Sequence, residues 1–230
     1  MSTMVATLLA RPRRVSLLGD LGRGEAGALP SLVAVTVAGA AVYGLVLGSW
    51  RGGWMIPATA VKLPLVLVGT ALLTMPLNWI LALLGGARLG GTAATALSFF
   101  ALAQAALVLA SLAPVAWLFT IAAPGPGLDA RTAHNLLYLL HTGLVALAGL
   151  AGASGLRRAF SQVTGDDRQA RRITRAWIVA FALMGGEVAW VLRPFVGSIY
   201  LPVTFLRPDA LDGNVYEFLI TDILPYVFGG

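Results

Sequence analysis

The sequence contains no cysteine, which excludes disulfide bonds, thiolate metal sites and cysteine nucleophiles. Only 11% of the 230 residues are charged and only two are histidines, so few groups are available for acid–base or metal chemistry. The sequence also lacks an HExxH motif, a phosphate-binding glycine loop with its lysine and a catalytic pair of aspartates. The sequence therefore argues against an enzyme, and we predict no metal, no catalytic residue and no other cofactor.

Long hydrophobic runs dominate what is present. Hydrophobic residues make up 58% of the chain, and the mean hydropathy is +0.82. A helix needs about 20 apolar residues to cross the hydrocarbon layer. We therefore predict an all-α, polytopic transmembrane bundle of about five spans. Five stretches qualify as spans: 31–49, 63–86, 92–122, 133–154 and 175–193.

The spans divide the chain into three parts. Residues 1–29 form a predicted cytoplasmic tail, 30–193 the transmembrane domain, and 194–230 an extracytoplasmic loop followed by an interfacial helix. That helix is expected at 215–228, where apolar residues recur near helical spacing. Residues 85–91 connect the second and third spans so briefly that these two helices must be antiparallel neighbours.

Positive charge predicts the orientation. The formal net charge is +6, and the 16 basic residues comprise fifteen arginines and Lys62. With the N-terminus inside, eleven of the 16 fall on the cytoplasmic side, as the disfavoured translocation of short basic loops requires. We therefore expect a cytoplasmic N-terminus and a C-terminus on the far side of the membrane.

The predicted cytoplasmic loop 155–175 holds the densest group of arginines. One interpretation is that these arginines only mark the cytoplasmic ends of two helices and so set the topology. A sharper hypothesis is that this loop docks anionic lipid headgroups or an acidic partner. Nucleic acid is not expected, because no recognition module or interleaved aromatic platform is present. The candidate contact residues are Arg157, Arg158, Arg171 and Arg172.

Two ionisable groups fall well inside the spans. Glu187 lies six residues before the outer end of the fifth stretch, and His141 lies eight residues into the fourth. Their depths agree, so a Glu187–His141 pair that handles a proton or cation is one hypothesis. The alternative is that Glu187 is satisfied elsewhere and that His141 hydrogen-bonds across a helix interface. Asn78 and Gln104 are predicted to form interhelical hydrogen bonds.

Histidine number argues against haem or pigment ligation. His134 and His141 share one helix face, and a bis-histidine haem needs its second ligand on a facing helix.

Small residues predict close helix packing in the first span at Ala40, Gly44 and Gly48. In the fourth span the same spacing pairs Gly149 with Ala153 and Ala148 with Gly152.

Five short runs form a further pattern: YGLVLG at 43–48, KLPL at 62–65, ASLAP at 110–114, WVLRPFVG at 190–197 and GNVYE at 213–217. The pattern covers roughly residues 38–219 and resembles uncharacterised bacterial inner-membrane proteins, which are similar to the Yip-type five-span family. This resemblance implies five spans in a bacterial inner membrane, a cytoplasmic N-terminus and a role in organising membranes or membrane complexes. It implies no catalytic residue. Arg193 and Phe195 then become a candidate fixed corner, as against a plain helix stop with a snorkelling arginine.

These features predict a non-catalytic integral membrane subunit that scaffolds or stabilises a larger bacterial membrane complex, with a respiratory or photosynthetic complex as one candidate host. We expect other membrane subunits as partners and bound lipid. The alternative is a small transporter or channel component with a proton or cation site at Glu187.

Overall fold

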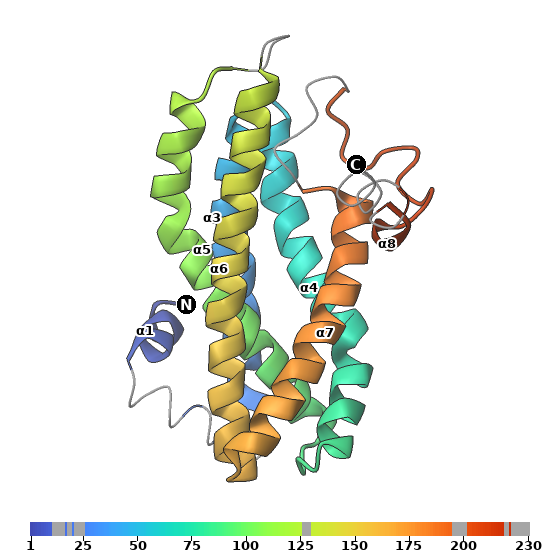
Figure 1. Ribbon diagram of the computed structural model, residues 1–230. Helices are drawn as coiled ribbons and strands as arrows, with labels where there is room; N and C mark the ends of the chain where they lie inside the picture. Colours follow the sequence, from blue (N-terminus) through green and yellow to red (C-terminus); the bar gives the residue numbers. More distant parts are fainter. Residues whose placement is uncertain are drawn as a thin grey trace.

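The computed structural model describes residues 1–10, 17, 20, 26–125, 130–194, 202–218 and 221. Every regular element among them is helical, which confirms the predicted all-α bundle (Figure 1). Five helices are long and apolar enough to cross a membrane. They are α3 (Leu29–Ser49), α4 (Met55–Leu84), α5 (Gly91–Ala122), α6 (Arg131–Thr164) and α7 (Asp167–Leu192). Three short elements accompany them: α1 (Ser2–Leu9), the 3-10 helix η1 (Ala26–Ala28) and α8 (Val215–Phe218).

Helix α3 is the most buried of the five long helices. It packs against α4 and α5, while α6 packs on α5 and α7 packs on α4 and α6. The turns at 85–90 and 165–166 and the start of α3 lie at one end of the molecule, at the bottom of Figure 1. We call this the hairpin end, and the end with residues 50–54, 123–125 and 202–218 the opposite end. Helices α4 and α5 are joined by the short turn as predicted, although each packs more extensively on α3.

Two glycines of α3 explain its deep burial. A Cβ at Gly44 would lie 2.5 Å from the carbonyl oxygen of Thr59, and one at Gly39 would lie 2.7 Å from that of Ala106. Without side chains, these positions let the backbones of α4 and α5 approach α3 directly. In α6 only one of the two predicted pairs has this role: Gly152 packs on the backbone of Ala101, whereas Gly149 has nothing within 4 Å.

The predicted loop 155–175 is mostly helix, so this prediction was wrong. Helix α6 continues to Thr164, and α7 begins at Asp167. Gly165 ends α6 in the left-handed conformation (φ 69°), and the Asp166 carboxylate caps α7 by accepting from the backbone N–H of Arg168 at 2.8 Å. Arginines mark the end of the hydrocarbon layer, but they are good helix formers, so a helix can continue beyond it.

Helix α4 begins earlier than predicted, at Met55 rather than residue 63. Lys62 therefore lies seven residues inside a membrane-length helix, roughly 10 Å along its axis. The sequence prediction had placed Lys62 just before the second span, which it began at residue 63. This change of position makes Lys62 a candidate functional residue.

The ends of the chain differ from expectation in one described part. Helix α1 was not predicted, and its Leu8 is 3% exposed in the same apolar cluster as Leu32 and Phe100. Figure 1 shows α1 beside the long helices. Of the predicted helix 215–228, residues 215–218 are helical and 221 is described, whereas the remainder lies outside the described residues, as does Phe195.

Candidate functional site

A buried tyrosine–histidine pair joins α3 and α6. The Tyr43 hydroxyl lies 2.8 Å from Nδ1 of His141, and the two rings meet edge to face with centroids 5.6 Å apart. Tyr43 is 0% exposed and His141 4%. The hydrogen bond satisfies the Tyr43 hydroxyl and one of the two ring nitrogens of His141, which lowers the cost of burying the two side chains. The sequence prediction identified His141 but missed Tyr43, which lies 98 positions away.

The structure does not bring His141 and Glu187 together. His141 Nδ1 is occupied by Tyr43, and its Nε2 has no hydrogen-bond partner in the part of the chain that is described. Helices α6 and α7 pack at the hairpin end through Phe160 and Trp177. Toward the opposite end α7 diverges from α6, as Figure 1 shows, and packs on α4. Equal depth was therefore insufficient, because the helices that carry the two residues separate at that depth.

Replacing either member of the Tyr43–His141 pair tests this bond. We expect Tyr43→Phe to lower the free energy of unfolding by about 1 kcal/mol, the usual contribution of an interhelical hydrogen bond in a membrane protein. His141→Leu should cost a similar amount, and the double variant should show a coupling of about 1 kcal/mol, measured by denaturant unfolding in detergent. Additive losses would contradict a direct bond.

Glu187 lies on α7 at the opposite end, five residues before the helix ends. It is partly exposed, and no hydrogen bond or ion pair of its carboxylate is found within the described ranges. Tyr216 of α8 lies close by: its hydroxyl donates a hydrogen bond to the carbonyl of Leu183 and rests against Gly186. Burial raises the pKa of Tyr216, and the negative charge of Glu187 raises it further.

Arg193 caps the C-terminal end of α7. Its backbone is left-handed (φ 44°), its guanidinium stacks 4.6 Å from the Trp190 ring centroid, and its Nε donates to the Trp190 carbonyl at 3.1 Å. The guanidinium also lies 4.0 Å from the Asp209 carboxylate. A positive φ is unusual for a residue with a side chain. The three contacts hold the corner where the chain leaves α7.

Lys62 is the buried charge that the sequence prediction missed. It is 3% exposed. Its Nζ lies 3.4 Å from the carbonyl oxygen of Thr204 and 5.4 Å from the centroid of the Phe205 ring. Lys62 forms no ion pair with a carboxylate of the described chain. The ammonium is thus held by a carbonyl and an aromatic face, and it attaches the segment 202–206 to α4.

Asn78 and Gln104 are both buried in the half of the bundle nearer the hairpin end. The side-chain oxygen and nitrogen of Asn78 have no partner among the described residues, and neither has the Gln104 nitrogen. The predicted interhelical bond is therefore not seen for Asn78. The Gln104 amide fills the space where Gly155 of α6 lacks a side chain.

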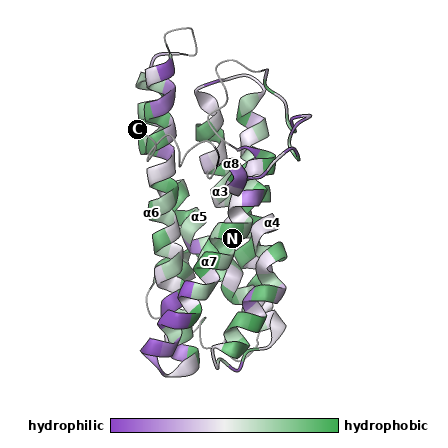
Figure 2. Cartoon of the chain, turned by 45° about the vertical axis from the view of Figure 1, so that its right-hand side comes forward, coloured by the Kyte–Doolittle hydropathy of each residue, from purple (hydrophilic) through white to green (hydrophobic). Residues whose placement is uncertain are grey.

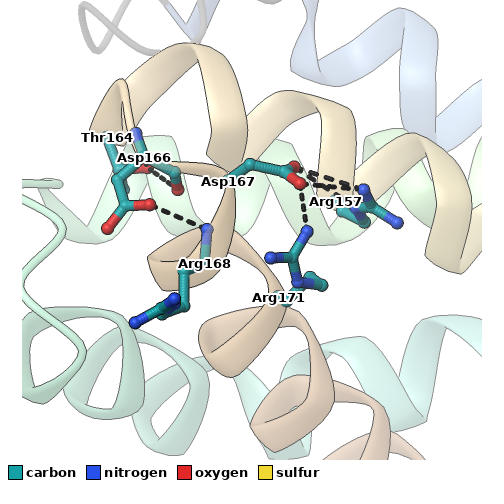
Figure 3. A network of polar contacts seen from close by, with 6 residues as sticks. All are labelled: Arg157, Thr164, Asp166, Asp167, Arg168 and Arg171. Atoms are coloured by element: carbon teal, nitrogen blue, oxygen red, sulfur yellow. Dashed lines mark hydrogen bonds and ion pairs between the residues drawn. The ribbon is translucent and has the colours of Figure 1, made fainter.

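A small polar network ties α6 to α7 at the hairpin end (Figure 3). Arg157 lies 3.0 Å from the Asp167 carboxylate, and Arg171 forms a second ion pair with it. Because these groups are about half exposed, the ion pairs contribute little to stability. Arg158 is exposed and has an interaction of its own, while Arg172 is exposed and has no ion-pair partner in the described chain. Within the same described residues, no group of three metal-binding side chains is found.

The fold and these sites define the class: a multi-pass membrane protein with five membrane-length helices. Comparison with protein-family models, with curated proteins and with solved structures found no match. The resemblance to Yip-type proteins therefore stays a prediction.

Proposed function

We propose that this chain is a non-catalytic subunit of a larger bacterial membrane complex, which it scaffolds or stabilises by binding a neighbouring membrane protein through α7. The role in organising membrane complexes implied by the Yip-type resemblance is part of this proposal. So are a bacterial inner-membrane location and a cytoplasmic hairpin end, which the excess of arginines at that end supports.

The observation that carries the proposal is the position of Glu187. Its carboxylate lies one helical turn before Trp190, on the side of α7 that also exposes Leu183 (49%) and Met184 (37%). A carboxylate amid apolar side chains at membrane depth is costly unless a donor reaches it. A donor on a neighbouring subunit would satisfy the charge and would fix the position of α7 against that subunit.

The test is gentle detergent extraction of the native membrane, followed by sizing and mass spectrometry. We expect the chain to co-migrate with a stoichiometric set of other membrane proteins. Glu187→Gln keeps the side-chain volume and removes the charge, and we expect it to reduce recovery of the contacting subunit at least tenfold, because it leaves a buried donor without its anion.

Glu217→Gln is the matched control, because Glu217 is an exposed carboxylate at the same end of the bundle. We expect it to leave recovery unchanged. Migration of the wild-type chain alone, as a monomer or a homo-oligomer, would overturn the proposal. The next measurement would then be proton flux into vesicles that contain either the wild-type protein or the Glu187→Gln variant.

A further inference from the structure

One face of α7 is exposed along much of the helix and changes character from basic to apolar. Its positions alternate in steps of four and three residues, which keeps them on one side of a helix. They are Arg168, Arg172, Arg175, Val179 and Ala182, all exposed. Leu183 widens the apolar part. Figure 2 shows the same change along α7, from hydrophilic at the hairpin end to hydrophobic beyond it.

The three arginines of this face are not neutralised by the chain. Arg157 and Arg171 share the carboxylate of Asp167, whereas the guanidinium groups of Arg168, Arg172 and Arg175 have no carboxylate partner in the described part of the chain. Asp166 accepts a hydrogen bond from the backbone N–H of Arg168, and Figure 3 shows the Arg168 side chain extending away from the carboxylates of Asp166 and Asp167. This face therefore presents three cations to its surroundings.

The lengths match one leaflet of a bilayer. Arg168 to Arg175 spans seven residues, roughly 10 Å along the axis. Arg175 to Gly186 spans a further eleven, roughly 16 Å, and there Tyr216 rests against the helix and closes the face. Half of the hydrocarbon layer is about 15 Å. A guanidinium group binds a phosphate through two parallel N–H donors.

We propose that this face binds an anionic phospholipid of the leaflet at the hairpin end. The headgroup phosphate lies on Arg168, Arg172 and Arg175, and an acyl chain lies along Val179, Ala182 and Leu183. An acidic protein or free phosphate would bind the arginines but would leave the apolar residues of the same face, which extend into the membrane, without a partner. Leu183 borders both this face and the Glu187 contact, but the headgroup site is separate from that contact because Arg175 lies twelve residues before Glu187.

Native mass spectrometry of the purified full chain in detergent provides the test. The protein is titrated with phosphatidylglycerol and, separately, with phosphatidylcholine of the same acyl chains. We expect phosphatidylglycerol to bind about 100-fold more tightly, because each arginine near an anionic lipid contributes about fivefold. The triple variant Arg168→Gln, Arg172→Gln, Arg175→Gln should bind the two lipids about equally.

The matched control is Arg11→Gln, Arg13→Gln, Arg14→Gln, which makes the same change in net charge elsewhere in the chain. We expect it to retain the preference for phosphatidylglycerol. Unchanged elution on size exclusion shows that each variant is folded. Equal binding of both lipids by the wild type, or a preference that survives the triple variant, overturns the proposal. Displacement of phosphatidylglycerol by millimolar inorganic phosphate also overturns it, because the source of the anion would then be soluble.

Discussion

Gly44→Ala is expected to destabilise the bundle by about 3 kcal/mol, at the upper end of the cost of overpacking. The added methyl group would lie 2.5 Å from the carbonyl oxygen of Thr59 and 2.8 Å from the Cα of Ala60. Both atoms belong to the backbone of α4 and cannot rotate away, so α3 and α4 must separate. Because α3 also packs on α5, the separation disturbs the α3–α5 contact as well. Thermal unfolding in detergent, followed by tryptophan fluorescence, measures the loss.

Gly149→Ala is the matched control for this prediction. Gly149 lies in the interior of α6, is exposed, and has nothing within 4 Å of the position that a Cβ would take. Alanine is favoured over glycine inside a helix by up to about 1 kcal/mol, so this variant should be slightly more stable than the wild type. The same glycine-to-alanine change is thus expected to lower the free energy of unfolding at position 44 and to raise it at position 149. Equal effects of the two variants would show that helix propensity, not the α3–α4 contact, decides the outcome.

Lys62→Glu is expected to lower the free energy of unfolding by about 3 kcal/mol or more. The new carboxylate would face the carbonyl oxygen of Thr204 and the ring face of Phe205, both of which carry negative charge density where the lysine ammonium now lies. It would be buried without a donor, which is among the most costly changes a site can suffer. The measurement is chemical unfolding in detergent.

Two controls separate charge from packing at this site. Lys62→Met keeps an unbranched side chain without charge, and we expect it to change the free energy of unfolding by less than about 1 kcal/mol. Arg131→Glu reverses a charge at an exposed position of the same end, and it should change stability by no more than about 0.5 kcal/mol. If Lys62→Met is as damaging as Lys62→Glu, losing the ammonium contacts with Thr204 and Phe205 explains the whole effect, and the repulsion argument fails.

Most of the fold was predictable, and the candidate sites were predictable only in part. The five apolar stretches identified the five long helices, because a helix that crosses lipid must be apolar for about 20 residues. Hydropathy located the hydrocarbon layer and not the helix ends, so α4 and α7 begin eight residues before the predicted starts. That shift moved Lys62 inside the bundle and turned a predicted loop into a helical hairpin. The capping signal was nevertheless present, in Gly165 and Asp166.

Partner choice among the buried polar groups was decided by the tertiary structure. The sequence identified His141 and Glu187 as ionisable groups inside the spans and estimated equal depths for them. Depth, however, is one coordinate of three. Because α7 diverges from α6 and each helix has its own rotation, His141 hydrogen-bonds to Tyr43, whereas Glu187 lies near Tyr216.

Composition and hydropathy alone determined the class of this protein, because transfer of apolar residues into lipid depends on their number and run length and not on their partners. The tertiary structure alone decided which side chains meet. Small residues occur at regular spacing in both α3 and α6, yet Gly44 and Gly152 lie in helix contacts and Gly149 faces outward. Which face of a helix turns inward depends on all its neighbours at once, and no local run of residues contains that information.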